Sequence, residues 1–444
     1  MTDHDEPAGD DDALGDALPP AAATEAIDIA PLQGLDAEEL RSVATREGIT
    51  LDASGDPNEL RFDLLKQLCT DQRPGRGEGT LQILNEGYGF LRSSQHNYLP
   101  ARHDIYVSPA QIHRLRLKHG HQVKGLVRGP RPKENYLALR QVETVNGSDI
   151  EGLWRRQPFE QLTPIFPQER LHLQHPDDLA DVRIVELLAP WGLGQRVLLQ
   201  TLPNAGCTSL LTRIVQAALA SNPDLYGIVC LLGERPEEVT EMRRLTGPET
   251  QREVLAATFD EPAARLIDLS RLALAKAQRM VETGHDVLLV MDSLNALVRA
   301  YHEKVPHSGK MLAVGLDAAA LQAPRQLFGS ARNTQEAGSL TIIATAAVDT
   351  GSRLDDLIAA EFLGKGNSDL VFDRTLADEH IYPALDLNRS RTRREDWILS
   401  PQEAEQLRTL RTQLAQLDRR QRLVRLQELI ESHADNAGIL AAVH

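Results

Sequence analysis

The stretch that decides the fold is Gln195-Arg-Val-Leu-Leu-Gln-Thr-Leu-Pro-Asn-Ala-Gly-Cys-Thr-Ser-Leu-Leu211, an apolar run, a loop of small residues and the start of an apolar helix. A small-residue loop between a strand and a helix N-terminus presents backbone N–H groups to phosphate oxygens. An ordinary strand-to-helix turn has a similar composition, so the loop by itself leaves both interpretations open. The candidate nucleotide-binding residues are Asn204, Ala205, Gly206, Cys207, Thr208 and Ser209.

The sequence around this loop predicts a parallel sheet covered by helices. Residues 195–200, 226–232, 286–291 and 340–345 are continuous apolar runs, as expected for buried parallel strands. Amphipathic segments such as residues 263–283 separate these runs and predict the covering helices. We therefore expect an α/β domain over residues 177–436, with a helical tail from Pro401 to Ser432.

Two carboxylates follow strands of this sheet. Asp292 comes directly after the run 286–291, where a Mg²⁺-holding aspartate belongs in phosphate-loop proteins. Glu234 ends another apolar run, where a carboxylate can orient a water for in-line attack. Each residue also has a structural interpretation, Asp292 as the N-cap of the next helix and Glu234 as a solvated helix start.

The N-terminal third divides into four segments. Residues 1–28 carry nine acidic residues and no Lys or Arg, and predict a disordered tail. Residues 29–74 contain two short helical patterns, the first with Asp36 as its N-cap and the second after Pro57. Residues 75–146 alternate in short runs and predict a small β-barrel that follows a flexible break near 73–79. Residues 147–176 form a connector.

Composition limits the class of protein. Hydrophobic residues make up 41% and charged residues 25%, the proportions of an average globular protein, and no apolar run approaches the ~20 residues of a membrane span. Three scattered cysteines predict neither a disulfide framework nor a zinc site, so we expect a cytoplasmic protein. The net charge of −16 disfavours indiscriminate nucleic-acid binding, but the stretch from Arg102 to Arg140 is basic.

Aromatic and basic residues alternate at the start of the predicted barrel. In Tyr88-Gly-Phe-Leu-Arg92, the side chains of Tyr88, Phe90 and Arg92 fall on one face of a strand. Such a face suits stacking on unpaired bases, with Arg92 near a phosphate. The alternative is that Phe90 belongs to the core of the barrel.

Several longer strings resemble the Rho family of transcription termination factors. They are Glu234-Arg-Pro-Glu-Glu-Val-Thr-Glu-Met242, Ala257-Thr-Phe-Asp-Glu-Pro-Ala263, Gly338-Ser-Leu-Thr-Ile-Ile-Ala-Thr345, Asp349-Thr-Gly-Ser352, Asn388-Arg-Ser390, Tyr88-Gly-Phe-Leu-Arg92 and Asp104-Ile-Tyr-Val-Ser-Pro109. The resemblance covers residues 79–400. It implies an OB-fold barrel, a RecA-like nucleotide domain, and a homohexameric ring that uses ATP and Mg²⁺. It also implies single-stranded RNA and the RNA polymerase elongation complex as partners, and no membrane.

The resemblance also assigns roles to individual residues. Thr208 and Asp292 correspond to the Mg²⁺ ligands, Glu234 to the catalytic glutamate, and Arg393 to an arginine finger donated to a neighbouring subunit. The implied RNA contacts are Tyr88, Phe90, Arg92, Tyr106, Arg114 and Tyr136 in the barrel, with Lys310 and Arg353 in two central-channel loops.

The chain departs from the family pattern around the phosphates. Cys207 stands where the family has the loop lysine, and a thiol is at best a weak neutral donor. Further departures, each at a position where the family has a charged residue, are Asn204, Gly233, Ala296 and His380. Two activities stay open: an RNA-dependent ATPase and translocase, or a hydrolysis-deficient RNA-binding paralogue that acts as a regulatory or mixed-ring subunit. A rotary-motor ATPase is a third and more distant possibility, which the barrel strings disfavour.

Overall fold

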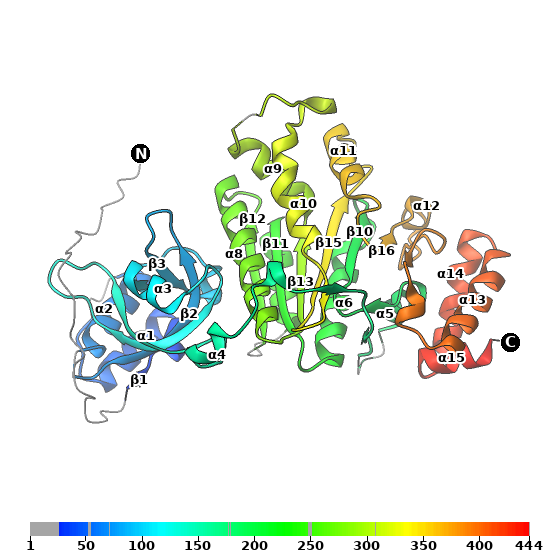
Figure 1. Ribbon diagram of the computed structural model, residues 1–444. Coiled ribbons are helices and arrows are strands. Elements are labelled where there is room, and N and C mark those ends of the chain that lie inside the picture. The colour runs from blue at the N-terminus through cyan, green and yellow to red at the C-terminus, as the bar shows by residue number, and fades with distance from the viewer. Residues whose placement is uncertain are drawn as a thin grey trace. The chain divides into compact units, whose positions relative to one another are not determined.

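The protein consists of two compact units, residues 1–156 and 157–444. The computed structural model describes residues 26–51, 55–70, 72–175, 177, 179–246, 251–306 and 308–443 (Figure 1). Residues 1–25 of the predicted acidic tail lie outside the described residues. The range predicted for that tail extends to residue 28, but Ile27 and Asp28 form strand β1. This strand pairs in parallel with Gly75 and Arg76 of β2.

Two short helices precede the barrel, α1 (Ala37–Arg46) and α2 (Pro57–Leu68). Asp36 caps α1 as predicted: its carboxylate accepts the N–H groups of Glu38 and Glu39, and Glu39 bonds back in a capping box. Leu40 on α1 and Leu64 on α2 are fully buried in one apolar cluster with the barrel residues, so the helices and barrel share a core.

Five strands of the first unit close into a barrel. They are β2 (Gly75–Ile83), β3 (Gly89–Arg92), β4 (Ile105–Val107), β5 (Gln122–Arg128) and β6 (Leu137–Val145). The strand order is β2-β3-β4-β6-β5, and a further β2–β5 pairing closes the ring. Helix α3 (Pro109–Leu115) lies between β4 and β5 in the sequence. This is the OB-fold expected for residues 75–146.

The flexible break predicted near 73–79 is wrong, because β2 begins at Gly75. Its glycines are required by packing. A Cβ on Gly77 would lie 2.7 Å from Ile105 Cδ1, and one on Gly79 would lie 2.9 Å from Leu91 Cβ. The glycines therefore let β2 run close to neighbouring side chains of the barrel.

The second unit is built on a seven-stranded sheet with the order β12-β11-β13-β15-β10-β16-β17. All pairs are parallel except β16–β17. The predicted strands are confirmed as β10 (Arg196–Thr201), β11 (Tyr226–Glu234), β13 (Val287–Asp292) and β15 (Leu340–Ala347). The remaining strands are β12 (Arg252–Thr258), β16 (Ser368–Val371) and β17 (Arg391–Thr392).

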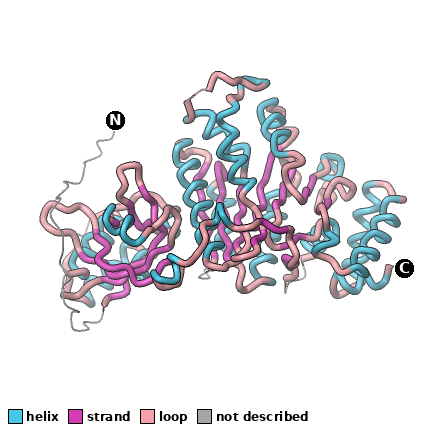
Figure 2. Tube along the Cα trace, viewed as in Figure 1, coloured by secondary structure: helices cyan, strands magenta, loops and turns pink. Residues whose placement is uncertain are grey.

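Helices surround this sheet, as Figure 2 shows by secondary structure. They are α5 (Ala180–Leu188), α6 (Cys207–Ser221), α7 (Pro236–Thr246), α8 (Ala263–Glu282), α9 (Leu294–Lys304), α10 (Gln322–Gly329), α11 (Arg353–Phe362) and α12 (Arg374–Asp378). The predicted helix 263–283 agrees with α8 to within one residue. The predicted connector divides between the units: α4 (Ile150–Trp154) belongs to the first, and the short strands β7 (Pro164–Ile165) and β8 (Arg170–Leu171) belong to the second.

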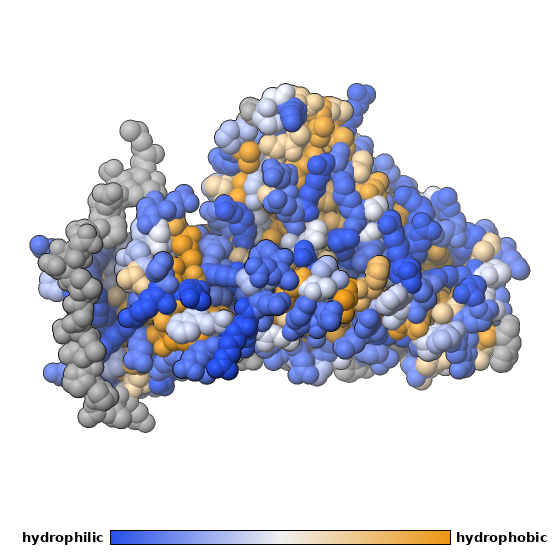
Figure 3. Space-filling model, in the orientation of Figure 1, coloured by the Kyte–Doolittle hydropathy of each residue, from blue (hydrophilic) through white to orange (hydrophobic). Residues whose placement is uncertain are grey.

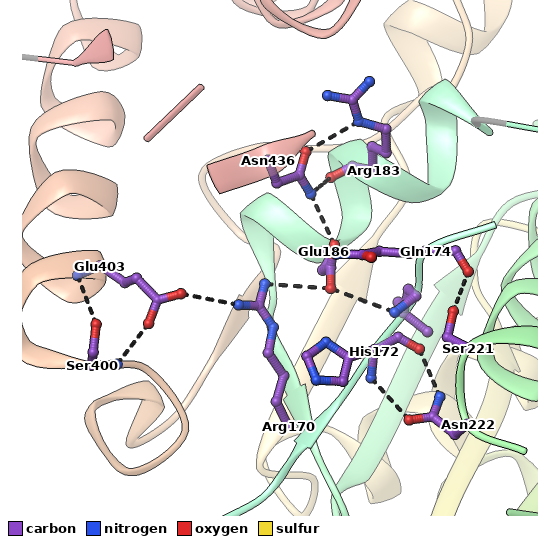
Figure 4. A network of polar contacts seen from close by, with 11 residues as sticks. Arg170, His172, Gln174, Arg183, Glu186, Ser221, Asn222, Ser400, Glu403 and Asn436 are labelled. Atoms are coloured by element: carbon purple, nitrogen blue, oxygen red, sulfur yellow. Dashed lines mark hydrogen bonds and ion pairs between the residues drawn. The ribbon is translucent and has the colours of Figure 1, made fainter. Parts of the chain in front are cut away.

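The C-terminal segment forms three helices, α13 (Pro401–Ala415), α14 (Arg419–Ser432) and α15 (Asn436–Ala442). The predicted helical tail 401–432 breaks at Asp418, which caps α14 in a capping box. A buried polar network attaches these helices to α5 (Figure 4). The guanidinium of Arg183 donates to the Asn436 side chain and to the carbonyls of Ile430 and His433.

Within the described ranges, no helix is both long and apolar enough to cross a bilayer. The face drawn in Figure 3 is mostly hydrophilic, with scattered apolar patches.

Candidate functional site

The predicted phosphate loop lies between the end of β10 and the start of α6. Asn204 (φ 60°) and Gly206 (φ 75°) adopt left-handed backbone conformations, which turn the chain sharply before the helix begins at Cys207. Ala205 is buried, whereas Thr208 is half-buried and Ser209 is exposed in the first turn of α6. The loop therefore places the free N–H groups of a helix N-terminus at the carboxyl edge of the sheet.

The side chain of Cys207 points into the loop and supplies no positive charge there. Its Sγ donates to the carbonyl oxygen of Leu202 at 3.3 Å, and its side chain packs against the apolar core. Burial, with a smaller contribution from the carboxylate of Asp292, raises the pKa of the Cys207 thiol to about 12. The thiol is neutral at pH 7 and adds no positive charge to the loop.

Three carboxylates, those of Asp292, Glu234 and Glu238, interact electrostatically with one another, and the charge of Asp292 also acts on Cys207 in this loop. Asp292, the last residue of β13, is 7% exposed and accepts a hydrogen bond from the Thr345 hydroxyl of the adjacent strand β15. Burial raises the pKa of Asp292 to about 6. Burial, then the charge of Asp292, then Glu238 raise the pKa of Glu234 to about 9. Sequence reasoning missed Glu238, although it stands only four residues after Glu234 in the same string.

Several arginines lie near the loop or the carboxylates. Arg213, on α6, is ion-paired with Asp181 at 2.6 Å. Arg235 is exposed beside Glu234, where its charge lowers the pKa of that carboxyl. Arg374 donates from Nη1 to the carbonyl of Pro203 in the phosphate loop, at 3.0 Å. Neither Ala296 nor Gly233 can replace a charged side chain, and the Cβ of Ala296 lies 3.3 Å from where a Cβ on Gly233 would stand.

Arg393 lies at the other end of the sheet. Its N–H donates to the Asn367 carbonyl at 2.8 Å, and its side chain lines a cavity of about 240 Å³ with Arg196, Lys365 and Arg394. Arg196 begins β10, whereas the phosphate loop follows its end at Thr201, five residues or about 17 Å along the strand. Arg393 therefore does not join the phosphate loop of its own chain.

Tyr382 is a second residue that sequence reasoning missed. Its ring lies 3.4 Å from the position of a Cβ on Gly206, and the residue is 44% exposed. An exposed aromatic ring beside a phosphate loop can stack on a nucleotide base. No periodic pattern marks Tyr382, because an irregular turn after α12 brings it to the loop.

Four aromatic rings gather on the barrel. Phe90 on β3 pairs across the strands with Tyr106 on β4, with ring centroids 5.9 Å apart. Tyr136 lies 4.8 Å from Phe90, and Tyr88 lies 5.8 Å from Phe90 and 5.7 Å from Tyr106. Phe90 is 7% exposed and Tyr136 is 37% exposed, so the tyrosines pack over the buried phenyl ring. We call these four residues the aromatic cluster.

Arg92 is buried and packs against a ring of the aromatic cluster. It is 6% exposed, its guanidinium carbon lies 4.9 Å from the Phe90 ring centroid, and it forms a buried ion pair with Asp104. Its Nε also donates to the Gln82 side chain at 2.8 Å. The structure thus places Arg92 beside the aromatic rings, as strand alternation predicts, but with its charge already paired.

The other predicted RNA contacts are dispersed. Arg114 is exposed on α3. In the second unit, Lys310 and Arg353 are both exposed. Lys310 belongs to the loop after α9, and Arg353 begins α11, which contacts the 3-10 turn Ala313–Gly315 of that same loop. These two cations therefore stand on neighbouring elements of the carboxyl edge.

An OB-fold barrel with an aromatic cluster and a RecA-like domain with a phosphate loop define a nucleic-acid-binding protein of the RecA-like ATPase class. Residues 77–151 match the Rho termination factor RNA-binding domain, and residues 181–392 match the nucleotide-binding domain of the ATP synthase alpha/beta family. The chain belongs to the Rho family of transcription termination factors: it is 43% identical over 422 residues to transcription termination factor Rho of Rhodopirellula baltica, covering 95% of this chain and 82% of that protein.

Other relatives give the same result. Transcription termination factor Rho of Aquifex aeolicus is 42% identical over 91% of this chain and 93% of its own. Transcription termination factor Rho of Chromobacterium violaceum is 44% identical over 85% and 90%. Among solved structures, the ATPase EscN of the type III secretion system of enteropathogenic E. coli has a TM-score of 0.53 at 20% identity, covering 69% of this chain and 76% of that one, which supports the fold alone.

Proposed function

We propose that this protein binds nascent single-stranded RNA through the aromatic cluster and acts in the cytoplasm on the RNA polymerase elongation complex. Membership of the Rho family supports this role, together with the match of residues 77–151 to the family's RNA-binding domain. Tyr136 is exposed and Tyr88 and Tyr106 are half-buried, so their accessible ring faces offer stacking surfaces to unpaired bases. Arg114, Lys310 and Arg353 add positive charge that suits the RNA backbone.

We further propose that the nucleotide domain binds ATP with Mg²⁺. The N–H groups of residues 204–209 would hold the phosphates, and Thr208 and Asp292 would hold the metal. A bound Mg²⁺ supplies charge stabilisation at the terminal phosphates. The donor set fits that ion, because oxygen ligands are what Mg²⁺ prefers. A positive ion among three carboxylates would also lower the raised pKa of Asp292 and Glu234.

Our proposal also concerns the rate of ATP hydrolysis. Because the phosphate loop is degenerate, ATP hydrolysis by this chain is much weaker than in a family member that has the loop lysine. The observation that carries this conclusion is the uncharged thiol of Cys207 in the loop, on which the carboxylate of Asp292 acts. Phosphoryl transfer is catalysed mainly by positioning and charge.

The last part of the proposal concerns assembly of the chain into a hexameric ring. Arg393 is too far from its own phosphate loop to act there, so a homohexamer would let it serve the nucleotide of a neighbouring subunit. A mixed ring with a lysine-containing paralogue is the second candidate. It is favoured by the same loop, because a subunit with weak hydrolysis would regulate the ring that it joins.

RNA-stimulated phosphate release by the purified full chain, measured beside Cys207→Lys, tests the proposal. We expect slow release by the natural chain, a gain of at least about tenfold in the variant, and equal RNA binding by both. Fast release by the natural chain would contradict weak hydrolysis. Failure of both proteins to bind single-stranded RNA would contradict the RNA-binding role.

A further inference from the structure

The phosphate loop keeps one cation that no family motif in the sequence identified. Arg374 is the first residue of α12, directly after Asp373, and α12 follows strand β16. Strand β16 pairs with β10, and β10 with β15, so all three strands end at the same edge of the sheet. Parallel strands bring their following loops together at this edge.

The guanidinium of Arg374 reaches the loops after both neighbouring strands. Its Nη1 donates to the Pro203 carbonyl in the phosphate loop at 3.0 Å, and its Nη2 donates to the Asp349 carbonyl after β15 at 3.4 Å. Both acceptors are neutral, and no carboxylate pairs with Arg374 among the described residues. The positive charge is therefore not neutralised by an ion pair.

Arg374 has N–H donors that its two bonds to the loops do not use. A guanidinium has five N–H donors in a planar fork, and two of those of Arg374 form the bonds to the loops. The remaining donors are available to an anion, which suits phosphate oxygens.

The position of Arg374 is itself held in place. The carboxylate of Asp373 caps α12 by accepting the N–H groups of Thr375 and Leu376, and it pairs with Arg419 of α14 at 3.1 Å. Arg213 lacks this geometry. Arg213 is on α6 itself, but its guanidinium is paired with Asp181 and 49% of its side chain is exposed.

We infer that Arg374 is the cation of this phosphate loop and binds the anionic phosphates of the nucleotide in the absence of the loop lysine. This inference rests on the nucleotide binding proposed above. Arg374 keeps the affinity for the ligand, but it stands at the Pro203 side of the loop, not at Cys207 in the helix start. It therefore supports binding without restoring the charge that the reaction itself requires.

Titration of the full chain with a fluorescent N-methylanthraniloyl derivative of ATP and MgCl₂ tests the inference. Arg374→Gln should raise the dissociation constant by about 10- to 150-fold, the range for loss of a charge-assisted hydrogen bond. Arg213→Gln is the matched control and should change it less than about twofold, because an exposed ion pair contributes little. Unfolding temperatures of all variants verify that they fold.

The double variant Arg374→Gln/Cys207→Lys distinguishes two roles of Arg374, the supply of positive charge and the tethering of the two loops. A lysine at residue 207 should restore the affinity lost in Arg374→Gln if the missing quantity is positive charge. Weak binding that the lysine does not restore, in a folded protein, would show that Arg374 only ties the two loops together and would overturn the inference. Unchanged affinity in Arg374→Gln, or no nucleotide binding by the natural chain, would also overturn it, whereas intact RNA binding would leave the proposed RNA-binding role standing.

Discussion

Replacing the tyrosines of the aromatic cluster should weaken RNA binding more than replacing the phenylalanine beneath them. Tyr136 is 37% exposed and can offer a ring face to a base, whereas Phe90 is 7% exposed and is enclosed by three other rings. Loss of one base stack costs about 1–3 kcal/mol by alanine substitution. Tyr88→Ala and Tyr136→Ala should therefore each raise the dissociation constant for single-stranded RNA by about 5- to 150-fold.

Phe90→Leu provides the contrast. It keeps apolar volume under the tyrosines but removes the ring on which they pack, so we expect a stability cost of about 1 kcal/mol and a smaller loss of RNA affinity. The two tyrosine effects should not add fully in the double variant, because both rings contact Phe90.

Fluorescence anisotropy with a labelled uridine-rich oligonucleotide measures these affinities, with urea unfolding as the check on stability. Phe259→Ala is a suitable control, since Phe259 is 68% exposed and belongs to the second unit. Tyrosine variants that bind like the natural chain would remove the aromatic cluster from the RNA site. A larger loss in Phe90→Leu than in either tyrosine variant would refute the ranking by exposure.

Three further predictions concern stability. Arg183→Met should lower the free energy of unfolding by about 3 kcal/mol, because it leaves buried carbonyls between α5 and the C-terminal helices without donors. Gly77→Ala should lower it by about 1–3 kcal/mol, because the new Cβ would overlap Ile105 inside the barrel. Glu234 should make stability fall as pH rises from about 4.5 towards about 9, because its raised pKa lets the folded state hold a proton that the unfolded chain has released.

Urea unfolding checks all three predictions. Gly329→Ala is the control for the glycine, because a Cβ there meets no atom within 4 Å, and an equal cost at both glycines would contradict the packing argument. Glu234→Gln should flatten the pH profile, and an unchanged slope would assign the proton to another group. Arg183→Met unfolding at the same urea concentration as the natural chain would mean that the network of Figure 4 does not stabilise the C-terminal helices.

The sequence determined those features that depend on periodicity and on local chemistry. Continuous apolar runs marked the buried parallel strands, and Asp36 marked the start of α1, because a capping carboxylate satisfies N–H groups within three residues. The sequence also shows directly that residue 207 is a cysteine and carries no permanent positive charge. Glycines misled the interpretation of residues 75–79, because a packing requirement across the barrel has no signal along the chain.

Only the tertiary structure decided which side chains share a pocket and in what state. It paired Arg92 with Asp104 beneath Phe90, added Glu238 to the carboxylates, and brought Arg374 to the phosphate loop from 171 residues away in sequence. Burial, and with it the pKa of Cys207 and Glu234, depends on what the whole fold packs around a group. The sequence states which residues are present. Their charges and partners are set by contacts that form only when strands distant in sequence end at the same edge of the sheet.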